Sequence, residues 1–171
     1  NPGRFIPDWT FGIRDDTMQE LVDEVRENER PDAVVVISHN GMDVDLKMAS
    51  VVSGIDAIFG GHTHDGMPAP TLVKNPGGQT LVTNAGSNGK FVGVMDFDIR
   101  NGKVQGFNYS LLPVFSNLLT PNAEMAQLIE DVRKPYSGWL NEELATADQL
   151  LYRRGNFNGT FDQVICDALN T

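Results

Sequence analysis

The sequence is poor in cysteine, in basic residues and in long apolar runs, and each shortage excludes a class of protein. Its one cysteine, Cys166, rules out a disulfide within the chain. The 13 lysines and arginines are outnumbered by 23 aspartates and glutamates, and a net charge of -10 leaves no basic face for a nucleic-acid backbone. No apolar run approaches the roughly 20 residues that span a bilayer. We therefore expect neither nucleic acid nor a membrane among the partners.

Cys166 lies within the apolar pattern Val164–Leu169, which is typical of the buried side of a helix. We interpret this cysteine as a core residue rather than a nucleophile. The chain begins Asn1-Pro2-Gly3 without a methionine and stops at Thr171 directly after this apolar stretch. Both ends predict an internal fragment of a longer protein.

The first third of the chain alternates helical and strand patterns. Met18, Leu21, Val22 and Val25 recur at helical spacing and predict an amphipathic helix over residues 16–29, opened by a capping box at Thr17. Strands are expected over 33–37 and 57–59, with a helix over 44–52 between them. This alternation predicts an α/β fold with loops at the carboxyl ends of parallel strands, where such sheets bind ligands.

The middle of the chain changes to β patterns. A strand is expected over 80–83, and an Asn-Gly pair between 91–99 and 104–112 predicts a hairpin with a two-residue turn. Residues 65–78 are rich in proline and glycine, and we expect them to form an exposed loop that covers the site. Helical patterns return over 121–147, with a break at Pro135, and over 162–169.

The chain has only three histidines, and each follows a predicted strand. His39 comes just after 33–37, and His62 and His64 lie in Gly60–Asp65, just after 57–59. Neutral imidazole is the commonest protein ligand of borderline divalent metals. Residues i and i+2 of a strand point the same way, and glycine lets the backbone approach an ion closely. The pattern predicts a metal site, with ordinary surface histidines as the alternative.

A hydrolytic two-metal centre also needs carboxylates, because three neutral nitrogens do not balance the charge of two cations. Asp43, Asp45 and Asp65 are near the histidines in sequence, but a helix cap or a turn explains each of them more simply. We therefore expect the remaining ligands and the catalytic residues upstream of Asn1. Two adjacent metals acidify a water molecule and hold an anionic tetrahedral group for in-line attack.

These motifs also carry a family resemblance. Ser38–Gly41 together with Gly60–His64 resembles the last two metal motifs of the calcineurin-like dinuclear metallophosphoesterases, in their 5'-nucleotidase branch. The resemblance implies that His39 and His62 bind one metal and His64 the other. It also implies a catalytic Asn-His pair that has no counterpart in this sequence.

The fold implied by the resemblance is a four-layer α/β/β/α sandwich followed by a separate domain. Residues 1–116 then form the C-terminal half of the catalytic domain, 117–147 a linker helix region, and 148–171 the truncated start of a 5'-nucleotidase-type C-terminal α+β domain. No internal repeat or low-complexity segment interrupts this division.

Three longer stretches, 6–14, 38–45 and 151–157, resemble the thiosulfohydrolase members of this branch, which act in the Sox system of sulfur oxidation. This finer resemblance implies a periplasmic enzyme with two manganese ions, although zinc or iron would also suit the ligands. The implied reaction releases sulfate from a thiosulfonate on a cysteine of the SoxYZ sulfur-carrier protein.

Four further polar residues are candidates for holding such a substrate. Arg153 and Arg154 present guanidinium forks that match sulfonate oxygens, and Asn156 lies in the same stretch. Asn40 can donate a hydrogen bond from the loop after the first strand. The alternatives are solvated surface arginines and an ordinary Asn-Gly turn.

Two other functions remain open on the sequence alone. A 5'-nucleotidase or nucleotide-sugar hydrolase on the same scaffold would need an aromatic pair to stack a base, and Phe157 alone does not decide this. A non-catalytic metal-binding or carrier-docking module belongs to a different class. Metal binding without turnover by the longer protein would favour that second alternative.

Overall fold

The computed structural model describes residues 3–153 and 159–170. The chain forms two compact units, Asn1–Thr120 and Pro121–Thr171, which are treated separately below. Within the described ranges, every helix is too short or too polar to cross a bilayer.

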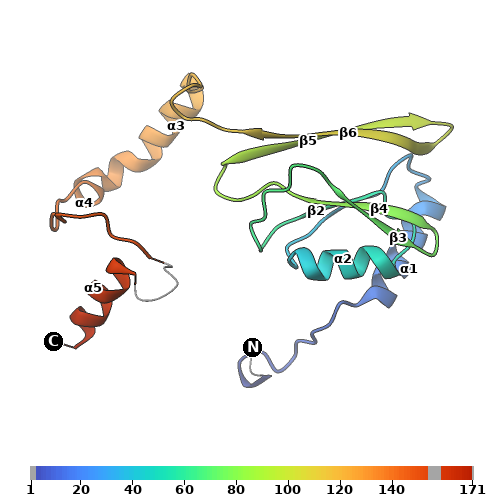
Figure 1. Cartoon of the computed structure of the whole chain (residues 1–171), viewed down its shortest axis with the longest axis horizontal. Helices are drawn as coiled ribbons and strands as arrows, with labels where there is room; N and C mark the ends of the chain where they lie inside the picture. The colour runs from blue at the N-terminus through green and yellow to red at the C-terminus, as the bar shows by residue number, and fades with distance from the viewer. Residues whose placement is uncertain (1–2, 154–158, 171) are drawn as a thin grey trace. The chain divides into compact units, whose positions relative to one another are not determined.

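The first unit is built around a four-stranded mixed sheet in the order β1-β2-β4-β3 (Figure 1). Strands β1 (Val35–Ile37), β2 (Ala57–Gly60) and β4 (Gly78–Asn84) are parallel, and β3 (Thr71–Asn75) is antiparallel to β4. The predicted α/β class is confirmed. Because β1, β2 and β4 run the same way, their carboxyl ends meet at one edge of the sheet.

Two helices cover one face of this sheet and enclose the core. Helix α2 (Met42–Val51) packs against β2, β3 and β4, and α1 (Asp15–Asn28) adds Val22 to the same core. The buried apolar cluster consists of Val22, Met48, Ala49, Val52, Ile55, Ile58 and Val82. This packing fixes the position of the strand ends relative to α2.

The predicted helix over 16–29 is confirmed as α1, but the capping box is wrong. The N-cap residue is Arg14, in the left-handed region at φ 55°, with no side-chain cap bond, and Thr17 lies inside the first turn. Asp15 and Asp16 occupy that turn, where a negative charge favours the positive end of the helix dipole. The helix therefore begins earlier than the Thr-x-x-Glu pattern indicates.

The prediction that residues 65–78 form a loop is wrong for the second half of the segment, which contains strand β3. β3 pairs with β4 from Thr71↔Val82 to Asn75↔Gly78. Thr71, Leu72 and Val73 have strand propensity, and the Pro-Gly-Gly run that follows makes the tight turn into β4. The density of proline and glycine marked the two ends of a strand rather than one continuous loop.

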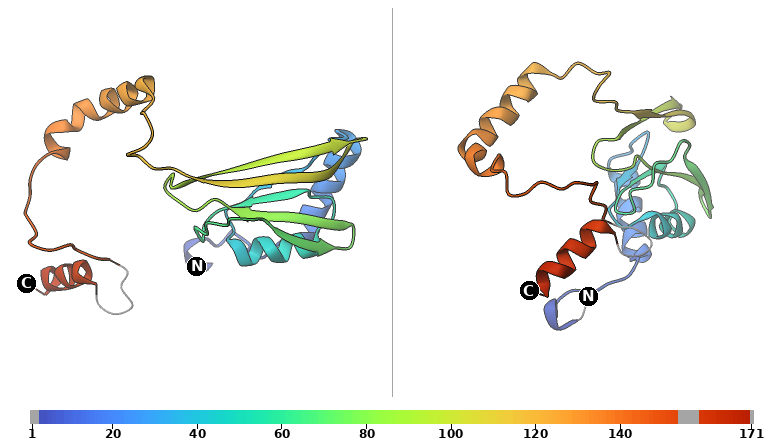
Figure 2. Two further views of the ribbon diagram at one scale, coloured as in Figure 1. Left: turned by 45° about the horizontal axis from the view of Figure 1, so that its top comes forward. Right: turned by 60° about the vertical axis from the view of Figure 1, so that its left-hand side comes forward.

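The predicted hairpin is confirmed as β5 (Phe91–Arg100) and β6 (Lys103–Pro113), with Arg100 opposite Lys103 across the turn. Figure 2 shows this hairpin over the face of the four-stranded sheet opposite to α2. A short 3-10 helix, η1 (Gly3–Phe5), lies near the N-terminus.

The second unit contains the predicted helices, with the region 121–147 shortened and the helix over 162–169 beginning two residues earlier. α3 (Ala123–Arg133) is capped by the side chain of Asn122, which accepts a hydrogen bond from the Met125 N–H. Pro135 lies in the 3-10 helix η2 (Lys134–Tyr136), followed by α4 (Ser137–Leu140) and α5 (Thr160–Leu169). Proline thus breaks the regular helix as expected, and the helical region ends before Ala147.

The interpretation of Cys166 as a core residue is wrong, because its side chain is exposed on α5. Among the described residues of the second unit, no hydrophobic side chain is fully buried. In the described part of this unit, the apolar side of α5 therefore packs against no buried core. The predicted boundaries between the catalytic domain, the linker region and the C-terminal domain, after residues 116 and 147, stay a prediction.

Candidate metal centre

The candidate site lies where three parallel strands end at one edge of the sheet. His39 follows β1, the Gly60–Asp65 segment follows β2, and Asn84 ends β4. The Ser38 N–H donates to the Phe59 carbonyl at 2.9 Å, which extends the β1–β2 ladder up to the residue before His39. The sheet therefore brings together loops that are far apart in sequence.

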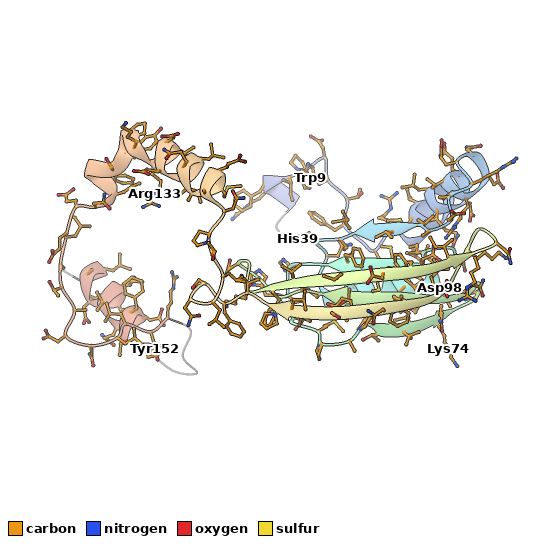
Figure 3. All side chains as sticks on the ribbon, turned by 90° about the horizontal axis from the view of Figure 1, so that it is seen from above. Trp9, His39, Lys74, Asp98, Arg133 and Tyr152 are labelled. Carbon is orange, nitrogen blue, oxygen red and sulfur yellow. The ribbon has the colours of Figure 1, made fainter. Side chains whose placement is uncertain are left out.

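His39 and His62 are neighbours in this structure. Their ring centroids are 5.1 Å apart and their planes meet at 75°. Figure 3 shows His39 just beyond the end of β1. A metal–nitrogen bond of about 2.1 Å puts a ring centroid about 3.2 Å from the ion, so two rings at octahedral or tetrahedral angles lie about 4.5–5.2 Å apart. The observed separation suits two ligands of one ion.

A turn, rather than a strand, presents His62 and His64. β2 ends at Gly60, and both histidines have left-handed backbones, with φ of 67° and 61°. The expectation that the two side chains share one strand face is therefore wrong. A left-handed conformation costs a non-glycine residue about 1–3 kcal/mol, and such residues cluster at ligand clamps and active sites. Two of them within three residues make this loop a candidate site.

Gly61 allows His39 to approach the Gly60–Asp65 loop, which carries His62 and His64. A Cβ atom at this position would lie 3.1 Å from His39 Nδ1 and 3.3 Å from the Ser38 carbonyl oxygen. Such contacts are tighter than side chains normally make, so a larger residue would push the His39 loop away. Glycine here was expected to let the backbone approach an ion closely, and the group that it admits in the structure is the His39 imidazole.

Hydrogen bonds from the end of β4 hold the Gly60–Asp65 loop in place. The Asn84 side chain, which is buried, donates from Nδ2 to the Gly61 carbonyl at 3.2 Å. The Gly86 N–H donates to the Asp65 carbonyl at 2.7 Å, and the Met67 N–H donates to the Asn84 carbonyl. Asn84 was missed by sequence reasoning, because only the paired strands show that it borders the histidine loop.

Of the three nearby aspartates, Asp45 has a role that the sequence analysis missed. It does not cap α2, whose N-cap is Gly41, but is completely buried beneath the strand ends and accepts a hydrogen bond from Ser38 Oγ at 2.5 Å. Asp65 accepts one from Thr63 Oγ1 at 2.5 Å within its turn, and Asp43 is exposed in the first turn of α2.

Across residues 3–153 and 159–170, no group of three or more His, Cys, Asp or Glu side chains is arranged to hold one metal ion. His39 and His62 form a pair of exposed, neighbouring nitrogen donors, and His64 stands in the same loop. The donor chemistry fits part of a metal centre, and a complete coordination shell needs ligands from elsewhere.

The predicted substrate-binding residues are distributed over both units. Asn40 is exposed beside His39, with its N–H donating to Ser38 Oγ at 3.2 Å. Arg153 belongs to the second unit, where its Nε lies 3.7 Å from Asp162 Oδ1. Arg154 and Asn156 lie outside the described residues.

No protein-family model matches the chain. Individual proteins do: the trifunctional nucleotide phosphoesterase YfkN of Bacillus subtilis is 32% identical over 155 residues, which are 88% of this chain and 10% of that protein. The chain therefore spans about a tenth of the length of this curated relative.

Two solved structures from Thermus thermophilus are similar in fold as well as in sequence. The sulfate thiohydrolase SoxB superposes with a TM-score of 0.82 at 31% identity, over 99% of this chain and 30% of that one. A 5'-nucleotidase precursor superposes with a TM-score of 0.72 at 25% identity, over 81% of this chain and 30% of that one.

Proposed function

Because the chain is homologous to part of the 5'-nucleotidase family of metallophosphoesterases, we propose that it carries part of the metal centre of a hydrolase. The observation that carries this proposal is the pairing of the His39 and His62 rings at the ends of two parallel strands. His39 and His62 are ligands of one metal, and His64, in the same left-handed loop, is a ligand of the second.

The centre holds two manganese ions when complete. The chain spans 30% of the SoxB structure that it resembles, and the other ligands and the catalytic residues belong to parts of the protein outside this stretch. A dinuclear centre supplies an acidified water and polarises the oxygens of a tetrahedral anion. Zinc or iron also suits imidazole ligands, so availability decides which metal is bound.

Backbone and side-chain hydrogen bonds of this chain orient the histidine ligands. The β1–β2 ladder and the Asn84 hydrogen bond to Gly61 fix the two histidine loops against each other before any ion arrives. Such pre-organisation lets the site bind metal without reordering its backbone. Asn40, exposed next to His39, donates a hydrogen bond to the anionic substrate.

The substrate is a thiosulfonate on a cysteine of the SoxYZ carrier protein, and the product is sulfate. The likeness to SoxB over 99% of the chain supports this choice, together with the three stretches that resemble thiosulfohydrolases. A sulfonate is a tetrahedral, oxygen-rich anion like a phosphoryl group, so the same centre suits both. Arg153, Arg154 and Asn156 bind its oxygens, and the enzyme works in the periplasm.

A nucleotide phosphohydrolase is the second candidate. The 32% identity to YfkN, named as a nucleotide phosphoesterase, and the likeness to a 5'-nucleotidase precursor favour it. It shares the metal centre and differs in the substrate. A metal-binding module without catalysis is the third candidate.

Metal analysis of the full-length protein tests the part of the proposal that all these candidates share. After dialysis against manganese and removal of excess ion, we expect two manganese ions per polypeptide by elemental mass spectrometry. A protein that retains no divalent metal under these conditions contradicts the proposed centre.

A further inference from the structure

One carboxylate next to the histidine loops is fully buried and only partly hydrogen-bonded. Asp45, in α2, has no exposed surface. Its Oδ1 accepts the hydrogen bond from Ser38 Oγ, while its Oδ2 makes no hydrogen bond with any residue in the described part of the chain. Burying a carboxylate is expensive unless its oxygens are paired, so this arrangement calls for an explanation.

Asp45 acts on the His39 loop through Ser38. Ser38 Oγ donates to Asp45 and accepts the Asn40 N–H at 3.2 Å, so the residues on both sides of His39 are tied to one buried carboxylate. A carboxylate acceptor makes such a hydrogen bond shorter and stronger than a neutral one. The two hydrogen bonds that link Asp45, Ser38 and Asn40 therefore restrain the backbone that carries the His39 imidazole.

Asp45 also borders the loop that carries His62. A Cβ atom at Gly60 would lie 2.6 Å from Asp45 Oδ2, so the carboxylate packs directly against the last residue of β2. One side chain thus contacts the ends of both strands that lead to the paired histidines. A cavity of about 180 Å³, lined by Ser38, His39, Asn40 and Asp45 among others, opens beside it.

We infer that Asp45 is a positioning residue for the metal centre: it sets the separation of His39 and His62 through Ser38 and Gly60. This inference rests on the proposed function. Asp45 contacts the residues that precede both histidines, and loss of groups that orient metal ligands without binding the metal themselves typically weakens metal binding 10–100-fold. The alternative is a structural link between α2 and the sheet, which would change stability without changing metal affinity.

The test uses the full-length protein, three variants and one control variant. Asp45→Asn keeps the size of the side chain and removes the charge, Ser38→Ala removes the hydroxyl, and the double variant combines them. Glu24→Gln, at an exposed carboxylate of α1, is the matched control for loss of one negative charge. Manganese affinity is measured by calorimetric titration, and thermal unfolding of the metal-free protein is measured in parallel.

We expect Asp45→Asn to weaken manganese binding about 10–100-fold and Ser38→Ala to weaken it in the same direction. The double variant should be no weaker than Asp45→Asn alone, because the two residues act as one unit. Glu24→Gln should bind as the wild type does. If Asp45→Asn does not fold, Ser38→Ala carries the test, since it removes only one oxygen.

Wild-type manganese affinity in both single variants, with only their unfolding temperatures lowered, would overturn the inference and leave the proposed function standing. Absence of manganese binding by the wild-type protein would overturn the proposed function and, with it, this inference. Purely additive losses in the double variant would also contradict a single linked unit.

Discussion

Replacement of His62 by alanine in the full-length protein should lower hydrolytic activity at least about 100-fold and reduce the metal content in parallel. His62 lies 5.1 Å from His39, measured between ring centroids, so its loss removes one of two neighbouring donors. The ligands that remain hold the ion less tightly, because each lost donor removes one metal–ligand bond. Activity and elemental analysis are measured on the same preparations, so that an inactive but metal-loaded protein is recognised.

The control for His62→Ala must reproduce its effect on the backbone. Asn88, in the exposed loop after β4, has a similar left-handed conformation at φ 56°. Asn88→Ala places alanine in the same unfavourable region without removing an imidazole, and it should retain metal and activity. Full activity and full metal content in His62→Ala would refute the ligand assignment. An equal loss in Asn88→Ala would assign the effect to backbone strain.

Replacement of Ile58 by alanine should destabilise the first unit by about 2–5 kcal/mol. Ile58 is 1% exposed at the centre of β2, in the cluster that contains Met48 and Val82. Truncation leaves a cavity between the sheet and α2 that the packed neighbours fill only partly. The stability is measured in the full-length protein by hydrogen exchange of the β2 and β4 amides, which reports on this unit alone.

Ile99→Ala is the matched control, because Ile99 in β5 is 42% exposed. It should lower the protection of the β2 and β4 amides by less than about 1 kcal/mol. Unchanged protection of β2 in Ile58→Ala would contradict the position of the core. Because β2 ends two residues after Ile58, the same variant also shows how strongly the histidine loops depend on that core.

The elements that sequence reasoning predicted well are those whose pattern is local. The amphipathic spacing of α1 and the Asn-Gly turn of the β5–β6 hairpin specify their structure from neighbouring residues alone. β3 was missed because a five-residue strand between proline and glycine clusters looks like a loop until its partner β4 is known. Strand pairing is a tertiary property that composition does not show.

The site shows the same division between local and tertiary information. The strand-end positions of His39 and His62 follow from the sequence, but the left-handed backbone of His62 and the T-shaped contact of the two rings do not. Asp45 looked like a cap because an aspartate early in a helix usually is one. Its actual partner, Ser38, comes from the end of a neighbouring strand, and only the folded unit reveals this contact.

The two solved structures have similar folds but are named for different substrates. A sulfate thiohydrolase and a 5'-nucleotidase precursor share this architecture with the chain, so the substrate cannot be deduced from the sheet and its loops. The stretches that favour the thiosulfohydrolases include 151–157, whose last four residues lie outside the described part of the chain. Substrate choice therefore has to be measured.

The most direct measurement is a parallel assay of the full-length protein, loaded with manganese, on two substrates. One is the SoxYZ carrier with a cysteine-bound thiosulfonate, and the other is AMP. The proposed function predicts release of sulfate from the carrier and no phosphate from AMP. Phosphate from AMP without sulfate from the carrier would contradict the thiosulfohydrolase assignment and place the protein among the nucleotidases.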